Sequence, residues 1–288
     1  PDVLNRSNLL SEFPLKVRLL GLETGKTTWR NLNKLTILSE YISRLPAHKI
    51  VVVLDLFDVV WLGCQRDLIE AFRKFGKPLV FSAEFEPYPL SNSSLERLPG
   101  GYPLFPGEHH STALLSFRRR HTGRELLRGQ REYRYLNAGC FVGYAYALRR
   151  ALDRMLAKDF DNEYVLRTPL AITEEERFNA LVGLDDQVAW HAYALKHRDE
   201  VALDYGAEMF LNVFGFVYQD FENRWGRTWV RPFQREVCFA HGNGASNIAI
   251  HLLIAQRMRT QPWKCRNAVE YYEGAQIHFL ACEGLSAI

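Results

Sequence analysis

Lys49-Ile-Val-Val-Val-Leu-Asp-Leu-Phe-Asp58 is the stretch that decides the fold class of this chain. An unbroken β-branched run of this kind is typical of a strand buried on both faces in the parallel sheet of an α/β protein. Such sheets bind ligands at the carboxyl ends of their strands, where Asp55 and Asp58 lie. Because carboxylates there often hold a divalent cation completed by substrate phosphates, the stretch predicts a metal-dependent enzyme acting on a phosphorylated or nucleotide-linked substrate.

Strand-like and helical segments alternate around this stretch. A short strand over 17–22 precedes a helix over 29–45, whose leucines and isoleucine fall on one stripe. A helix near 66–75 separates the 49–55 strand from a strand over 78–82, which predicts a parallel or mixed sheet with helical crossovers. Further strands are expected over 135–144, 201–204, 209–214 and 237–240, and further helices over 146–157, 185–197 and 246–258.

Length and composition indicate an ordinary globular protein. The 288 residues are 47% hydrophobic and 24% charged, and neither a repeat nor a linker is visible. We therefore expect a single domain over 1–288, with a core of about 15–258 and a C-terminal tail over 259–288. The net charge of +3 is too small to favour nucleic acid as a partner. No apolar run approaches the roughly 20 residues that span a bilayer.

The segment from 86 to 133 breaks the alternating pattern. Its first part is rich in proline and glycine, and its second part is rich in arginine. Loops of this length are usually functional or disordered. For the arginines, a solvated helix face is favoured over a dedicated anion site.

The cysteines show no metal-ligand spacing. Cys140 and Cys238 lie in apolar strand-like runs and are predicted to be small buried residues. Cys265 and Cys282 bracket the tail and are candidates for a pair, which spacing alone does not establish. Sequons at Asn5 and Asn92 point weakly to a secretory protein, although no signal peptide is visible.

A second candidate site is the turn His241-Gly-Asn-Gly244, which follows another apolar strand. A lone histidine is more often structural than a ligand. Here, however, the glycines would let the backbone approach a diphosphate, and the next helix N-terminus supplies N–H groups for phosphate oxygens. Imidazole beside two carboxylates suits Mn²⁺ better than Ca²⁺, so His241 is a candidate metal ligand and Asn243 and Gly244 are candidate cofactor-binding residues.

Three further groups of polar and aromatic residues are candidates for the site. Asp185-Asp186-Gln187 reads as an acidic helix N-cap, or as two carboxylates of which one serves as a base or binds hydroxyls. Asn137 and Gly139 sit at a strand start, where the glycine permits close backbone approach. Tyr88 and Trp61 are candidate platforms for a sugar face, or core residues.

Two other function classes compete with this interpretation. A haloacid-dehalogenase-like phosphatase also has a buried strand ending in aspartate, a strand ending in serine (Ser82) and a late Asp-Asp pair. It needs a second aspartate two residues after the first, and Phe57 holds that position. A non-enzymatic sugar-binding module would not require a cation-binding pair.

Taken together, these segments resemble the glycosyltransferase domain of the procollagen lysyl hydroxylase/glycosyltransferase family. The matching blocks share their order and spacing over roughly residues 15–258. They are Leu20-Gly-Leu22, a helix with Lys34, Val53-Leu-Asp-Leu-Phe-Asp-Val59, Val80-Phe-Ser-Ala-Glu84, Leu136-Asn-Ala-Gly-Cys-Phe-Val-Gly-Tyr-Ala145, Asp185-Asp-Gln187, Leu203-Asp-Tyr205, Phe210-Leu-Asn212 and His241-Gly-Asn-Gly244.

The resemblance implies a GT-A type, Rossmann-like α/β fold with a mixed, mostly parallel sheet flanked by helices. It implies that Asp55, Asp58 and His241 hold Mn²⁺, through which a UDP-sugar binds. Phe57 would stack near the uracil, and Lys34 matches a basic residue near the nucleotide.

For the sugar and the acceptor, the resemblance implies further roles. Asp185 and Asp186 would line the sugar and acceptor site, Tyr88 stands where relatives carry a tryptophan, and Asn137 and Gly139 would border the donor sugar. The donor would be UDP-glucose or UDP-galactose, and the acceptor a hydroxylysine-linked glycan of a collagen-like protein. Such an enzyme would work in the secretory pathway, in the endoplasmic reticulum or Golgi lumen.

The chain departs from the family pattern in three places. The acidic run is two residues long, and Asn247 stands where relatives carry a lysine that reaches the diphosphate. The first strand of the relatives is missing before Pro1, which suggests a truncated chain. These departures leave an inactive sugar- or nucleotide-binding homologue as an alternative. Nothing resembles the family's iron- and 2-oxoglutarate-dependent hydroxylase domain.

Overall fold

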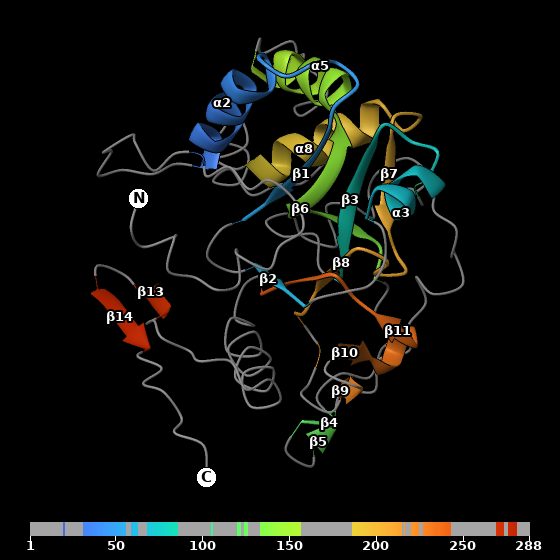
Figure 1. Cartoon of the computed structure of the whole chain (residues 1–288), viewed down its shortest axis with the longest axis vertical. Coiled ribbons are helices and arrows are strands. Elements are labelled where there is room, and N and C mark those ends of the chain that lie inside the picture. The colour runs from blue at the N-terminus through green and yellow to red at the C-terminus, as the bar shows by residue number, and fades with distance from the viewer. Residues whose placement is uncertain are drawn as a thin grey trace.

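A computed structural model describes residues 20, 31–55, 59–62, 68–85, 105, 120–121, 124–125, 133–156, 186–214, 216, 220–224, 227–242, 269–273 and 276–280. Its centre is a four-stranded sheet in the order β1-β6-β3-β7 (Figure 1). The strands are β1 (Ile50–Leu54), β6 (Tyr135–Tyr144), β3 (Leu79–Glu84) and β7 (Val201–Asp204).

The central sheet is mixed, as the sequence predicted. Strands β1, β3 and β7 run in one direction, because β1 and β3 are both antiparallel to β6 and β7 is parallel to β3. Among the described strands of this sheet, β3 and β7 are the one parallel pair of neighbours and the other two pairs are antiparallel, so the expectation of a mostly parallel sheet was wrong. The prediction that β1 is buried on both faces was wrong: every residue of β1 is half-buried, whereas β3 is buried throughout. Within the described sheet β1 is an edge strand, covered by a neighbour on one side only.

Three helices cover one face of the sheet and a fourth covers the other (Figure 1). Along β3, Leu79, Phe81 and Ala83 enter the larger core, and Val80 between them enters the smaller one. This two-residue alternation is the expected geometry of a strand between two layers. The larger core lies under α2 (Asn31–Ile42), α5 (Ala145–Leu156) and α8 (Asp186–Lys196), and the smaller core includes α3 (Leu68–Lys74).

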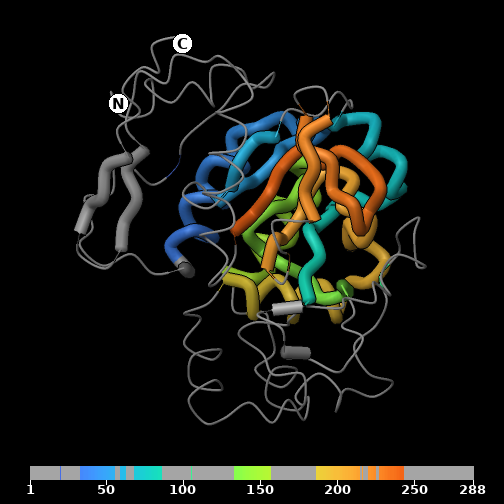
Figure 2. The backbone as a smooth tube through the Cα atoms, turned by 90° about the horizontal axis from the view of Figure 1, so that it is seen from below, coloured from blue at the N-terminus to red at the C-terminus, as the bar shows by residue number. Residues whose placement is uncertain are grey.

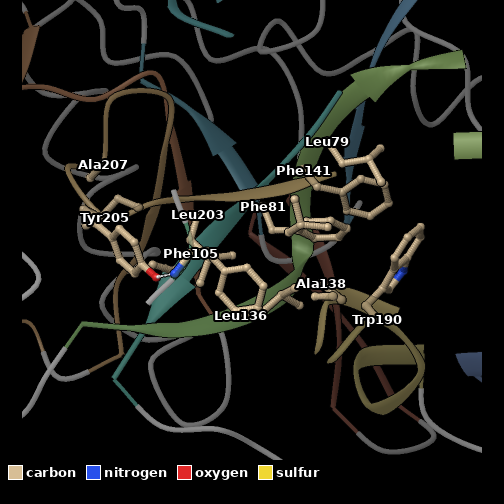
Figure 3. Close-up of a cluster of buried hydrophobic side chains, with 14 of the residues drawn as sticks. Leu79, Phe81, Phe105, Leu136, Ala138, Phe141, Trp190, Leu203, Tyr205 and Ala207 are labelled. Atoms are coloured by element: carbon tan, nitrogen blue, oxygen red, sulfur yellow. Dashed lines mark hydrogen bonds between the residues drawn. The ribbon is translucent and has the colours of Figure 1, made fainter. Parts of the chain in front are cut away.

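Aromatic side chains join α8 to the sheet. The Trp190 ring lies 5.0 Å from that of Phe81 and 5.1 Å from that of Phe141, measured between centroids (Figure 3). At the other end of the cluster, the Phe105 backbone N–H donates to the Tyr205 hydroxyl at 2.8 Å. Because Trp190, Phe81 and Phe141 are fully buried, their contacts hold α8 against β3 and β6.

A second, three-stranded sheet in the order β2-β12-β8 adjoins the first. Its members are β2 (Val59–Trp61), β12 (Phe239–His241) and β8 (Phe210–Asn212). Segments near residues 60 and 240 thus lie side by side (Figure 2). The remaining elements are β9 (Phe221–Arg224), β10 (Arg227–Val230), η3 (Arg231–Phe233), β11 (Arg235–Glu236), and the pairs β4 (Arg120–His121) with β5 (Arg124–Glu125) and β13 (Val269–Glu273) with β14 (Gln276–Leu280).

Most predicted elements that fall in the described residues are confirmed, with ends shifted by up to three residues. Within the arginine-rich stretch, residues 120–121 pair with 124–125 as a hairpin, so a helix face was wrong there. Cys140 is a free buried thiol, as predicted, whereas Cys238 is buried but disulfide-bonded. The predicted helix over 246–258, the strand over 17–22 apart from Leu20, and the other cysteines lie outside the described residues. No helix in the described part of the chain is long and apolar enough to cross a bilayer.

Candidate functional site

Four elements meet at the ammonium group of Lys34, in the first turn of α2. Lys34 Nζ lies 2.5 Å from Asp55 Oδ1, just past β1, and 3.0 Å from Asp186 Oδ2, at the start of α8. It also donates to the backbone oxygen of Ala138 on β6 at 3.3 Å. The structure thus brings together three predicted site residues that are far apart in the sequence.

The charges in this cluster are largely shielded from water. The side chains of Lys34 and Asp186 are 19% and 10% exposed, and that of Asp55 is 34% exposed. Burial by itself would lower the pKa of Lys34, but the charges of Asp186 and Asp55 outweigh it and raise that pKa above its ordinary value. Burial raises the pKa of Asp186, against the opposing effect of Lys34. With both carboxylates ionised, the cluster carries one net negative charge.

A bulge in β6 lies beside this cluster. Phe81 on β3 pairs with Phe141, but the next residue, Ser82, pairs with Asn137, so residues 138–140 of β6 are extra. Asn137 Oδ1 accepts a hydrogen bond of 2.8 Å from the Gly139 N–H. The Gly139 oxygen accepts one of 2.8 Å from the Asp55 N–H. Bulges of this kind commonly re-aim side chains beside active sites.

His241 packs against this bulge from the second sheet. It is buried at the end of β12, and its imidazole abuts Gly139: a Cβ at that position would lie 2.6 Å from Nε2 and 2.7 Å from Nδ1. Real Cβ atoms do not approach other atoms so closely, which explains why the position is glycine. The sequence already pointed to Gly139, because a glycine inside a strand often marks a place where another group approaches the backbone closely.

The tautomer of His241 follows from its neighbour Asn212. The Asn212 Nδ2 donates to the Ala83 oxygen at 2.6 Å, so Oδ1 is the amide atom that faces the imidazole. His241 Nδ1 lies 2.6 Å from that oxygen and therefore carries the proton. The lone pair is then on Nε2, which is the form in which a histidine ligates a metal.

Two of the three expected metal ligands lie beside the same glycine. Asp55 and His241 both contact Gly139, one through its backbone N–H and the other through its ring. A carboxylate and an imidazole together suit Mn²⁺, and the cluster has a negative charge to offset. Among the described residues no three His, Cys, Asp or Glu side chains gather closely enough to hold a metal ion. The third expected ligand, Asp58, lies outside the described residues.

Comparison with known proteins gives a distant family-level link. The chain is 24% identical to procollagen-lysine,2-oxoglutarate 5-dioxygenase 1 of Mus musculus over 201 residues, which is 67% of this chain and 24% of the relative. It is 25% identical to the type 2 protein of Mus musculus over 174 residues (60% and 20%) and 23% identical to the type 1 protein of Gallus gallus over 208 residues (71% and 22%). The chain spans about a quarter of the length of these relatives, which are enzymes by name. No protein-family model matches it.

The other predicted site residues fall into two groups. The centroid of the Trp61 ring lies 4.9 Å from that of Phe239, and Trp61 packs against the smaller core. This agrees with the second alternative for Trp61, a core residue. Ser82, on which the phosphatase alternative depends, is fully buried and donates to the Asn137 oxygen at 3.2 Å. Outside the described residues lie Asp185, Phe57, Asp58, Tyr88, Asn243 and Gly244.

Two residues that contact the site, Asn212 and Gln187, were given no role in it by the sequence analysis. Asn212 orients His241, and Gln187 donates to Glu84 and accepts from the Ala138 N–H. The signal for Asn212 was its position at the end of a strand next to the one that carries the histidine, since β8 and β12 pair in parallel with Asn212 opposite His241.

Proposed function

We propose that the chain is a Mn²⁺-dependent glycosyltransferase that moves a hexose from a UDP-sugar to a hydroxyl acceptor. One observation carries the proposal: Lys34, Asp55, Asp186 and His241, from four different elements, all contact the Ala138–Gly139 bulge or one another. They gather where β1 ends, the edge at which α/β sheets bind ligands. The distant similarity to procollagen-lysine dioxygenases supports an enzyme of this family.

Asp55, Asp58 and His241 would hold the ion. When bound, Mn²⁺ supplies a Lewis acid that offsets negative charge on the diphosphate of the departing UDP. Asp55 has a second carboxylate oxygen besides the one paired with Lys34, and Asn212 keeps the lone pair of His241 on Nε2. In this proposal Asp55 and His241 would each offer the ion one donor atom, Oδ2 and Nε2.

Lys34 and Asp186 would act on the substrates. Lys34 holds both carboxylates at short range, and its positive charge would partly offset the negative charge that a diphosphate would meet there. Asp186, or its neighbour Asp185, would orient the donor sugar or accept the proton of the acceptor hydroxyl. A raised pKa brings the Asp186 carboxylate closer to the range in which a general base works at neutral pH.

The names of the relatives refer to procollagen lysine, which supports a hydroxylysine-linked glycan of a collagen-like protein as the proposed acceptor. We propose UDP-glucose or UDP-galactose as donor from the resemblance stated in the sequence analysis. The disulfide at Cys238 is consistent with an oxidising compartment. We therefore place the reaction in the secretory pathway.

A UDP-release assay across several UDP-sugars, with Mn²⁺ or with chelator, tests the proposal. We expect release that requires Mn²⁺ and that falls about 100-fold or more in Asp55→Asn, because second-shell changes alone already cost 10–100-fold. The matched control is Glu70→Gln, an exposed carboxylate on α3. Undiminished release in chelator or in Asp55→Asn would refute the metal role. Binding of UDP-sugar without turnover would instead support the inactive homologue.

A further inference from the structure

The bulge in β6 determines how far apart two of the proposed metal ligands lie. Gly139 accepts a hydrogen bond from Asp55 and packs against His241. Residues 138–140 have no partners on β3, because the register jumps past them. Buried backbone groups need partners from elsewhere, so the residues that supply them control the shape of the bulge.

Ala138 is held from two helices. Its N–H donates to Gln187 Oε1 of α8 at 3.1 Å, and its oxygen accepts from Lys34 Nζ of α2 at 3.3 Å. The Lys34 contact belongs to the charged cluster already described. The Gln187 contact reaches the bulge from the second residue of α8, directly after Asp186.

The orientation of the Gln187 amide is set by Glu84. Gln187 Nε2 donates to Glu84 Oε1 at 2.7 Å, and Glu84 is 2% exposed at the end of β3. An ionised carboxylate accepts hydrogen bonds and donates none. The amide nitrogen of Gln187 must therefore face Glu84, which leaves its oxygen for the Ala138 N–H.

We propose that Gln187 is a positioning residue of the candidate metal site, and that Glu84 orients it. Through Ala138, Gln187 holds the bulge at the place where Asp55 and His241 can share one ion. This inference rests on the proposed function, since it concerns the geometry of the proposed Mn²⁺ ligands. Residues hydrogen-bonded directly to metal ligands typically change metal affinity by about 10–100-fold when they are mutated, and Gln187 acts one step further from the ligands.

The test exchanges the two side chains. In Gln187→Glu a second carboxylate faces Glu84, and like charges at this distance repel. We expect the dissociation constant for Mn²⁺, measured on the full chain by electron paramagnetic resonance of the free ion, to rise about 10-fold, the lower end of the range for residues bonded directly to a ligand. In Glu84→Gln/Gln187→Glu the amide at 84 donates to the carboxylate at 187, whose other oxygen accepts from Ala138. This exchange keeps the net charge, so Mn²⁺ affinity should return to near the wild-type value.

Two measurements separate positioning from other effects. Gln234→Glu adds the same charge at an exposed glutamine and should leave Mn²⁺ affinity unchanged. Unfolding by urea is followed in parallel, because a purely structural role would lower stability without changing the affinity of the folded chain. Two results would overturn the positioning role alone. One is an unchanged Mn²⁺ affinity in Gln187→Glu. The other is an exchange variant, Glu84→Gln/Gln187→Glu, that binds Mn²⁺ no better than Gln187→Glu does. A wild-type chain that does not bind Mn²⁺ would overturn the proposed function as well.

Discussion

Replacing Gly139 by alanine tests the geometry of the site most directly. A Cβ at this position would lie 2.6 Å from His241 Nε2 and 2.7 Å from Nδ1, whereas ordinary contacts are longer than 3.4 Å. The ring atom nearest to that Cβ is Cε1, which lies closer still, so the ring must retreat by more than an ångström. Neither side is free to move, because the bulge is tied to Asp55 and Asn137 and the ring is tied to Asn212.

The expected loss of unfolding free energy in Gly139→Ala has two parts. Overpacking of a close-packed interior costs about 1–3 kcal/mol. Breaking the hydrogen bond between His241 and Asn212 adds about 0.5–1.5 kcal/mol. We expect Gly139→Ala to lose about 1.5–4.5 kcal/mol of unfolding free energy by these principles, and to bind Mn²⁺ about 10–100-fold more weakly because a ligand has been displaced.

Urea unfolding and Mn²⁺ titration of the same samples give both quantities. Gly76→Ala is the matched control: Gly76 has a φ of +61° with nothing within 4 Å of the added Cβ, so alanine there strains the backbone without touching the site. In Gly139→Ala/His241→Ala the clash is relieved, and the double variant should be more stable than additivity predicts. Wild-type Mn²⁺ affinity in Gly139→Ala, or strict additivity in the double variant, would refute the close packing of His241 on the bulge.

Two further predictions concern buried charge. Lys34→Met leaves Asp55 and Asp186 without their shared ammonium; we expect unfolding free energy to fall by about 2 kcal/mol, discounted for the partial exposure of Asp55, and Lys34→Arg, measured alongside, should lose less. Burial lowers the pKa of His191 to about 3, against about 6.5 in the unfolded chain. The unfolded state therefore binds the proton first as pH falls below 6.5, so about 2 kcal/mol of stability is lost by pH 5. In His191→Gln this part of the slope between pH 7 and pH 5 should disappear from urea unfolding curves.

Local patterns predicted the elements well. The stripe of apolar residues in the first helix places Leu35, Leu38 and Ile42 in the core, where the structure has them buried. The strand over 135–144 has the bounds of β6. These successes rest on periodicities of 3.6 and 2 residues, which are properties of the chain itself.

The arrangement of the strands was harder to predict, because it depends on pairing between distant segments. The apolar run of β1 has the composition of a central strand, yet β6 lies between β1 and β3 and runs against both. The three-residue shift in the β6 register has no local signature beyond a glycine. Because that shift could not be predicted, the contact between Gly139 and His241 and the role of Gln187 could not be inferred from the sequence.

Among the described residues, the charges around Lys34 would favour a cationic ligand. Two carboxylates share one ammonium in a region where two of the three side chains are less than 20% exposed. Buried ion pairs rarely add stability over apolar residues of the same size, and an excess carboxylate adds a further desolvation penalty. The pairing of both Asp55 and Asp186 with Lys34 is therefore not expected to stabilise the fold relative to apolar side chains. A divalent ion bound at Asp55 would supply the missing positive charge, and it would leave Lys34 to neutralise Asp186.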